Sequence, residues 1–202
     1  MDDTFTNWIN GLRFTIYSNH ATLYECRAVG EIQIPRMIYG VPVTGIGSAA
    51  FCGNGDVTSV DIPSSVRIIY QNAFRNCFGL KKVAIPQSVE YIGSFAFCGT
   101  KLKKDIFVKA TDAAMCCRRK QYEMNTWFEE PKADLCRCGF HYCENAFDIF
   151  RYYDGYCGEI GTARFFEVEV DGVSSQKSED SKRVCKRIKF VREFKSYAEL
   201  LN

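Results

Sequence analysis

The chain has 202 residues, of which 47% are hydrophobic and 25% charged, a composition typical of soluble globular proteins with one large domain or two small ones. Its formal net charge of +2 excludes a global field that would attract nucleic acid or an anionic membrane surface. No apolar run approaches the roughly 20 residues of a membrane-spanning helix, and the acidic start, Met1-Asp-Asp, lacks the features of a secretory signal. We therefore expect a cytoplasmic protein with no membrane partner, whose eleven cysteines are mostly reduced.

The first residues predict a β-hairpin. Two alternating apolar runs, residues 12–17 and 21–26, flank the polar pair Asn19-His20. A short strand at 32–34 ends at Pro35.

From Val43 onward the sequence repeats. The pairs Ala50-Phe51, Ala73-Phe74 and Ala96-Phe97 recur at a constant interval, and Ile46, Ile69 and Ile92 recur with them. A fixed period of roughly 20–29 residues with constant apolar positions is typical of a leucine-rich-repeat solenoid. Because one unit cannot bury its own face, the units are expected to stack, with the hairpin as an N-terminal cap.

Two segments carry a resemblance to a known family. Val57-Thr-Ser-Val-Asp-Ile-Pro-Ser-Ser-Val66 and Leu80-Lys-Lys-Val-Ala-Ile-Pro-Gln-Ser-Val89 resemble the BspA-like type of leucine-rich repeat, and the likeness covers residues 12–103. The resemblance implies a curved scaffold whose open face binds other macromolecules, and it implies no catalytic residue. We assign residues 1–104 to this domain. The cysteines that follow the Ala-Phe pairs, Cys52, Cys77 and Cys98, are expected to line its core.

Residues 105–202 are predicted to form a small α+β domain. Strands are expected at 105–111, 139–143, 164–170 and 184–191, with a short strand or turn at 121–124. A helix is expected after Asn145, with Phe147, Phe150 and Tyr153 on its apolar face. Ser196 and Glu199 form a capping-box pattern that opens a short terminal helix.

A second resemblance covers residues 106–202. The segments Cys138-Gly-Phe-His-Tyr-Cys-Glu-Asn145, Asp148-Ile-Phe150 and Arg164-Phe-Phe-Glu-Val-Glu169 are similar to an uncharacterised family of phage and bacterial proteins with a Gly-Phe-His-x-Cys strand motif. The resemblance implies a phage or bacterial origin and no mechanism.

The order of motifs in the second domain also resembles the layout of ADP-ribosyltransferases. Lys109-Ala-Thr111, then Gly139-Phe-His-Tyr142, then Glu167-Val-Glu169 are similar to the segments that build an NAD cleft in that superfamily. The resemblance implies Lys109, Thr111, His141 and Tyr142 as ligand-binding residues, and His141, Glu167 and Glu169 as catalytic residues. Lys109-Ala replaces the expected Arg/His-Gly, however, and alternating glutamates are also typical of the solvated face of a strand.

Two cysteine-based sites are alternatives. Cys136, Cys138, His141 and Cys143 are zinc-ligand types, but structural zinc sites usually combine two well-separated pairs, so buried thiols and a hydrogen-bonded histidine are favoured. His141 with Cys143, Cys116 or Cys117 could form a nucleophile pair, although no local signature supports it.

The sequence as a whole favours a non-enzymatic protein that binds a protein partner through its repeats, as a phage or bacterial host-interaction factor. The basic residues between 182 and 192 alternate with apolar ones, as on a half-buried strand, so no nucleic-acid partner is expected. The alternative hypothesis is an NAD- or nucleotide-binding, ADP-ribosyltransferase-like domain that the repeats target.

Overall fold

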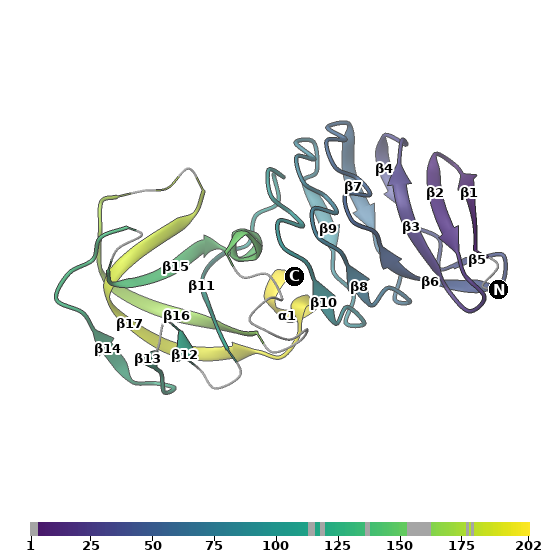
Figure 1. The fold of residues 1–202 in the computed structure, drawn as a ribbon. Helices are drawn as coiled ribbons and strands as arrows, with labels where there is room; N and C mark the ends of the chain where they lie inside the picture. The colour runs from purple at the N-terminus through teal and green to yellow at the C-terminus, as the bar shows by residue number, and fades with distance from the viewer. Residues whose placement is uncertain are drawn as a thin grey trace. The chain divides into compact units, whose positions relative to one another are not determined.

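The computed structural model describes residues 4–112, 116–117, 120–135, 138–152, 163–176, 178 and 180–202. The chain forms two compact units (Figure 1). Unit 1 comprises Met1–Leu102 and Ser196–Asn202, and unit 2 comprises Lys103–Lys195. The chain therefore leaves unit 1 after the repeats and returns to it for residues 196–202. The sequence predicts these residues as part of the second domain. The division into functional domains 1–104 and 105–202 stays a prediction.

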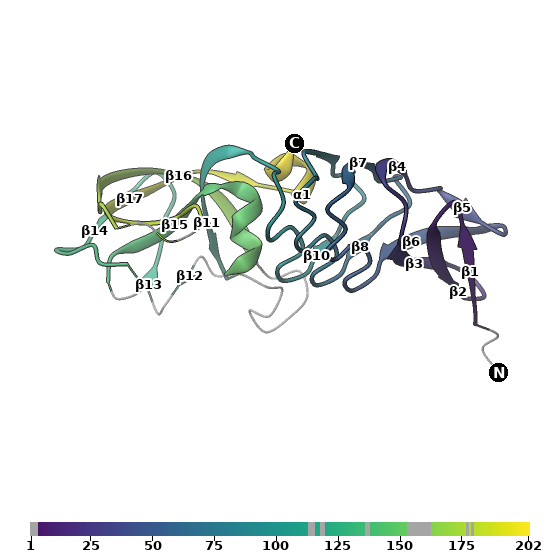
Figure 2. The same cartoon turned by 90° about the horizontal axis from the view of Figure 1, so that it is seen from above.

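Unit 1 contains two sheets, and successive repeats add parallel strands to each of them (Figures 1 and 2). The larger sheet begins with an antiparallel meander and continues as a parallel ladder, with strands β1 (Phe5–Ile9), β2 (Leu12–Ile16), β3 (Ala21–Cys26), β6 (Val41–Ile46), β8 (Ile68–Ile69) and β10 (Tyr91–Ile92), and with β5 (Met37–Ile38) paired to β6. The smaller sheet is parallel and contains β4 (Gly30–Gln33), β7 (Val57–Asp61) and β9 (Lys82–Ala84). The predicted hairpin is confirmed as β2 and β3.

The repeats pack through a column of phenylalanines. The ring centroids of Phe51 and Phe74 are 4.7 Å apart, and those of Phe74 and Phe97 are 5.4 Å apart, both in stacked geometry. All three side chains are buried. Because each ring contacts the ring of the next repeat, no single repeat can bury its own phenylalanine, which is the physical basis of the stacking.

The cysteines after the Ala-Phe pairs differ in their surroundings. Cys77 is buried, and its thiol donates to the carbonyl oxygen of Phe51 at 2.9 Å. Burial raises the pKa of the Cys77 thiol to about 12, although a hydrogen bond from the backbone at Asn54 opposes the shift. Cys98 is half-buried, and Cys52 is exposed. The prediction that all three line the core is therefore wrong for Cys52.

The end of each repeat turns through a left-handed residue. Gly53, Asn76 and Gly99 occupy equivalent positions and have φ values of 76°, 59° and 77°. A Cβ atom at Gly99 would lie 2.6 Å from the side-chain oxygen of Asn76 in the preceding repeat. Glycine is needed there for both its conformation and the close approach of the two turns.

Helix α1 (Tyr197–Leu201) covers the last repeat of unit 1. As predicted, Ser196 caps it, with its side chain accepting a hydrogen bond from the backbone NH of Glu199. The side-chain amide of Asn202 forms two hydrogen bonds with the backbone of Ile85. Its Nδ2 donates to the Ile85 carbonyl at 2.9 Å, and its Oδ1 accepts from the Ile85 NH at 3.0 Å. These bonds satisfy backbone groups beside β9 that the end of a solenoid would leave open.

The replacement Asn202→Ala is expected to destabilise unit 1 by about 1–2 kcal/mol, because it removes two hydrogen bonds to the end of the array. Chemical denaturation of the full chain measures this change. Gln71→Ala is the matched control, since Gln71 is an exposed residue of the same unit. Equal stability of the two variants would contradict a capping role for Asn202.

Unit 2 is built on a ring of four antiparallel strands. These are β11 (Asp105–Thr111), β15 (Phe140–Asn145), β16 (Arg164–Val173) and β17 (Lys182–Phe194), and the ring closes because β17 pairs with both β15 and β16. Strand β14 (Trp127–Glu129) extends the sheet along β17, while β12 (Cys116–Cys117) and β13 (Lys120–Gln121) form a separate pair. A closed ring leaves no free edges between its members.

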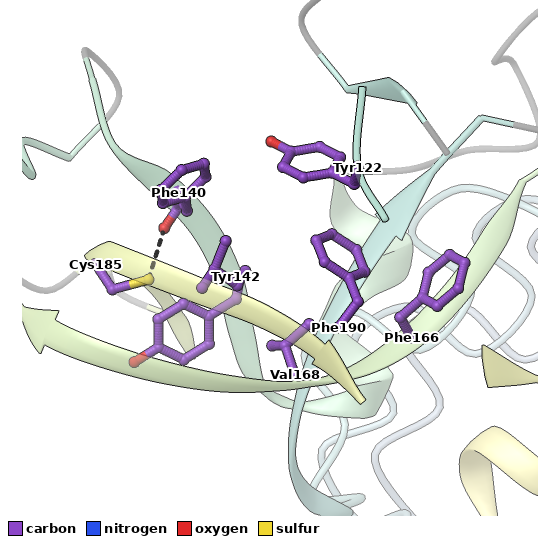
Figure 3. Close-up of a cluster of buried hydrophobic side chains, with 8 residues drawn as sticks. Tyr122, Phe140, Tyr142, Phe166, Val168, Cys185 and Phe190 are labelled. Atoms are coloured by element: carbon purple, nitrogen blue, oxygen red, sulfur yellow. Dashed lines mark hydrogen bonds between the residues drawn. The ribbon is translucent and has the colours of Figure 1, made fainter. Parts of the chain in front are cut away.

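Aromatic side chains dominate the core of unit 2, part of which is shown in Figure 3. The cluster comprises Tyr122, Phe140, Tyr142, Phe166, Val168, Cys185, Ile188 and Phe190. Phe166 and Phe190 meet edge to face with centroids 5.2 Å apart, and the ring centroids of Tyr122 and Phe190 are 4.7 Å apart. The thiol of Cys185 donates to the carbonyl oxygen of Phe140 at 3.5 Å.

Charged side chains pair across β16 and β17. Glu167 faces Arg192, Glu169 faces Lys189 and Asp171 faces Arg187 in the strand register, with N–O distances of 3.0, 2.6 and 3.1 Å. Opposite charges placed directly across two strands support their register. This ladder accounts for much of the basic run that the sequence shows between residues 182 and 192.

The structure does not support the prediction of an α+β domain for residues 105–202. Within the part of unit 2 that the structure describes, the helical segment is η1 (Ala146–Arg151), a 3₁₀-helix, and the rest is mainly β-strand. Asn145 caps η1 as predicted, and Phe147 and Phe150 are buried, but Tyr153 lies outside the described residues. Sequence periodicity does not separate one or two 3₁₀ turns from the start of an α-helix. No helix among the described residues is long and apolar enough to cross a membrane.

Candidate functional site

A pocket of about 450 Å³ opens beside the N-terminal half of β15 in unit 2. We call it the lysine pocket, and its lining comprises Lys109, Lys120, Tyr122, Glu130, Cys138, Gly139, Phe140, His141, Tyr142, Cys143, Ile149, Tyr152 and Lys182. Its volume lies within the range of about 300–1,000 Å³ that is typical of small-molecule sites. The lining therefore combines three ammonium groups, one carboxylate and several aromatic rings.

Lys109 is the most unusual of these residues. It lies in the middle of β11 and is only 3% exposed. Its Nζ donates to the backbone carbonyl of His141 on β15 at 2.9 Å and lies 5.9 Å from the ring centroid of Tyr122. An ammonium is costly to bury in a protein interior, so its presence in a strand core indicates a function or a compensating environment.

The other two lysines also lie over aromatic rings. The Nζ of Lys120 is 4.7 Å from the centroid of Phe140, and the Nζ of Lys182 is 4.3 Å from the centroid of Tyr152. Lys120 also forms an ion pair with Glu130 at 2.6 Å. Because cation–π contacts hold an ammonium beside an apolar surface, each lysine places positive charge next to a flat wall of the pocket.

A hydrogen-bonded carboxylate lies beside the pocket. Asp180 accepts hydrogen bonds from the hydroxyls of Ser178 and Tyr152, from the backbone NH of Lys182 at 2.9 Å and from Arg151 at 3.1 Å. Burial alone would raise the pKa of Asp180, but these bonds outweigh it and bring the pKa to about 2. The hydrogen bonds of Asp180 thus fix the positions of the Tyr152 side chain and of the start of β17.

Strand β15 approaches its neighbours closely at the pocket. Gly139 has a φ of 87°, and a Cβ atom there would lie 2.9 Å from both the Cys185 carbonyl oxygen and a Val184 methyl group. Burial raises the pKa of the Cys143 thiol well above its usual range, with nearby Asp148 and Asp180 adding to the shift. A thiol in that state is protonated at neutral pH and is a poor nucleophile, which does not favour a pair of His141 with Cys143. The Cys116 and Cys117 side chains lie outside the described part of the structure.

The structure separates the predicted catalytic and ligand-binding residues into two groups. Lys109, His141 and Tyr142 line the lysine pocket. Thr111 is 1% exposed, does not line it, and donates to the Asp112 carbonyl at 3.0 Å.

Neither predicted catalytic glutamate lines the pocket: Glu167 and Glu169 pair with basic residues of β17 instead. A hydrolytic or transfer site needs a carboxylate aimed at the reacting atoms. The arrangement thus brings His141 and Tyr142 to a pocket without these glutamates.

The residues proposed as zinc ligands are only partly described. Cys138, His141 and Cys143 line the pocket, while Cys136 lies outside the described residues. Among the residues that the structure describes, no group of three or more His, Cys, Asp and Glu side chains is placed to hold a metal ion.

Sequence reasoning missed several pocket residues. Lys120, Tyr122, Glu130 and Lys182 come from three other segments of the chain and meet only in the folded unit. No local motif marks them, because their spacing in the sequence carries no information about their distance in space.

A second hollow lies on the smaller sheet of unit 1, with a volume of about 810 Å³. We call it the repeat face, and its lining comprises Asn10, Leu12, Ala28, Val29, Glu31, Ile32, Gln33, Thr58, Ser59, Val60, Asp61, Lys82 and Ala84. The outward residues on β4, β7 and β9 are short or polar, and each strand contributes some of them.

Comparison with protein families identifies the first half of the chain. The model described as "BspA type Leucine rich repeat region (6 copies)" matches residues 12–113, which is half of the chain. The chain belongs to this family. The leucine-rich repeats are thus confirmed, and a second model, "Domain of unknown function (DUF7666)", matches residues 106–202. That match confirms the resemblance of this segment to an uncharacterised family. Neither model supports an ADP-ribosyltransferase-like domain.

Solved structures similar to the chain are leucine-rich-repeat proteins of bacteria. A leucine-rich-repeat protein of T. pallidum is 26% identical, with 47% of this chain and 46% of that chain covered and a TM-score of 0.44. A leucine-rich cell surface protein of Faecalibacterium prausnitzii A2-165 is 33% identical, with 50% and 30% covered and a TM-score of 0.45. A leucine-rich-repeat protein of Bacteroides capillosus ATCC 29799 is 30% identical, with 48% and 78% covered and a TM-score of 0.45. The chain thus spans less than half the length of the first two proteins. The comparison with curated proteins gave no match.

Proposed function

We propose that the leucine-rich repeats bind a protein partner through the repeat face, and that the chain acts by recognition rather than catalysis. The observation that carries the proposal is the hollow of about 810 Å³ over β4, β7 and β9. Parallel strands in neighbouring repeats present rows of side chains at a regular spacing, which suits recognition of an extended surface.

The chemistry of the repeat face indicates the kind of partner. Alternate residues such as Ile32 and Val60 point into the core, so the outward positions are free to carry polar groups. Glu31 and Asp61 supply two carboxylates, Lys82 one ammonium and Ser59 a hydroxyl group. A partner segment with hydrogen-bonding groups and a small excess of positive charge would complement this face.

In the alternative function, an NAD- or nucleotide-binding domain of the ADP-ribosyltransferase type, it is the transferase activity that has weaker support. The lysine pocket places His141 and Tyr142 at a cavity, but Glu167 and Glu169 are engaged in the charge ladder of β16 and β17. A role as a phage or bacterial host-interaction factor and a cytoplasmic location stay predictions.

Site-specific photo-cross-linking in the full chain tests the repeat face. A photoreactive amino acid at Ser59 is expected to give discrete adducts with partner protein in a cell extract, because Ser59 lies in the hollow. The matched control places the same amino acid at Glu90, an exposed position of unit 1 that does not line the hollow. Adducts of equal yield at both positions, or none at Ser59, would show that the repeat face is not the binding surface.

A further inference from the structure

The lysine pocket in unit 2 has a charge that the rest of the protein does not share. The chain as a whole carries a formal net charge of +2, yet three lysines and a single glutamate line this one cavity, and the Asp180 carboxylate beside it is paired with Arg151. A concave site with an excess of one sign of charge focuses its field on the ligand. This excess of positive charge favours an anion over a cation.

The position of Lys109 strengthens this selectivity. Its ammonium is 3% exposed and lies between β15 and the Tyr122 ring. Electrostatic interactions grow as water is excluded, so an anion that reaches this end of the pocket interacts more strongly with Lys109 than with a lysine on the surface. Lysine is also a common partner of phosphate groups in protein sites.

The aromatic lining adds a second requirement. Phe140, Tyr122 and Tyr152 each lie beneath a lysine of the pocket. Phe140 and Tyr122 are buried, whereas Tyr152 is 39% exposed and offers an aromatic ring beside the positive charges. Stacking on an aromatic side chain is a common way for proteins to bind a base. A ligand that joins a planar ring to an anionic group would use both features.

We propose that the lysine pocket binds a small anion with a planar ring, of the chemical class of a nucleoside monophosphate. The phosphate would lie against Lys109, Lys120 and Lys182, and the base against the exposed ring of Tyr152. The volume of about 450 Å³ is in the lower half of the range for small-molecule sites, which favours a mononucleotide over a dinucleotide such as NAD. The proposal concerns unit 2 and is independent of protein binding at the repeat face.

Isothermal titration calorimetry on the full chain separates the two requirements. The probes are AMP and UMP, which carry both a ring and a phosphate, adenosine, which has the ring alone, inorganic phosphate, which has the anion alone, and NAD. At least one of the two monophosphates is expected to bind at least tenfold more tightly than adenosine, inorganic phosphate and NAD. Affinity should also fall as salt rises, because ions screen the lysines.

Two substitutions link the binding to the pocket. Lys182→Met is expected to weaken monophosphate binding about tenfold or more, the loss typical of one charge-assisted hydrogen bond. Lys186→Met is the matched control, because Lys186 lies on the same strand but is exposed and does not line the pocket. Lys120→Met gives a second test on another strand. Thermal unfolding confirms that each variant folds before it is titrated.

Three results would overturn the proposal. The first is that neither monophosphate binds. The second is that inorganic phosphate or NAD binds as tightly as the better monophosphate. The third is that both pocket variants, once shown to be folded, bind the monophosphate like the Lys186→Met control. Tight binding of NAD that depends on Lys182 would instead assign the pocket to a dinucleotide.

Discussion

Replacing Phe74 with alanine is expected to lower the free energy of unfolding of unit 1 by about 3–5 kcal/mol. Phe74 is fully buried and stacks on Phe51 on one side and on Phe97 on the other. Its loss removes apolar burial and opens a cavity between two neighbouring repeats. Since most domains are stable by only about 5–15 kcal/mol, the variant should unfold at a much lower denaturant concentration than the wild type.

The matched control is Phe78→Ala in the same repeat. Phe78 is 58% exposed, so its removal should change the stability by less than about 0.5 kcal/mol. Urea denaturation of the full chain, followed by circular dichroism, gives both values. If the two variants unfold at the same urea concentration, the phenylalanine column does not hold the repeats together.

Replacing Asp180 with alanine is expected to destabilise unit 2 by about 2–4 kcal/mol, because it removes the buried member of a partly buried ion pair. The side chain of Asp180 is 7% exposed and pairs with Arg151 at 3.1 Å. It also accepts hydrogen bonds from Ser178 and Tyr152, which join the segment before β17 to the end of η1. Without the carboxylate, these donors lose their acceptor.

The same carboxylate predicts how stability changes with pH. The pKa of Asp180 is lowered from 3.8 to about 2 in the folded protein, so the folded state prefers the ionised form. The corresponding stabilisation, about 2 kcal/mol, is present above pH 4 and is lost as the pH falls toward 2. The stability difference between the wild type and Asp180→Ala should therefore shrink over that interval.

Asp171→Asn is the control for the Asp180 experiment. Asp171 forms an ion pair with Arg187, but its side chain is 61% exposed, and such pairs contribute about 0–1 kcal/mol. Thermal or urea unfolding at several pH values compares the variants. A difference between the wild type and Asp180→Ala that is constant from pH 6 to pH 2 would contradict the assigned role of the carboxylate.

The two units place the proposed activities in different kinds of structure. The repeat face is a regular surface made by parallel strands of successive repeats, whereas the lysine pocket is an irregular cavity lined by side chains from several segments of unit 2. Regular surfaces suit extended partners, and enclosed cavities suit small ligands. Recognition of a protein and binding of a small anion can thus be tested separately in the same chain.

The repeat architecture could be predicted from the sequence alone. Ala50-Phe51, Ala73-Phe74 and Ala96-Phe97 recur at a constant interval, because each repeat supplies one phenylalanine ring that stacks on the ring of the next repeat. Cap signals are equally local, so the sequence alone predicts that Ser196 and Asn145 cap the starts of α1 and η1.

Only the tertiary structure decided how distant residues combine. Lys109, Lys120 and Lys182 meet at one pocket through the closure of β11, β15 and β17, and the sequence contains no sign of that closure. Glu167 and Glu169 show the converse, because the resemblance to ADP-ribosyltransferases implies a catalytic pair, yet the register of β16 and β17 pairs each of them with a basic residue. Local periodicity can be read from residues close together in the sequence. The closure of the sheet and the register of its strands depend on contacts between segments far apart in the chain.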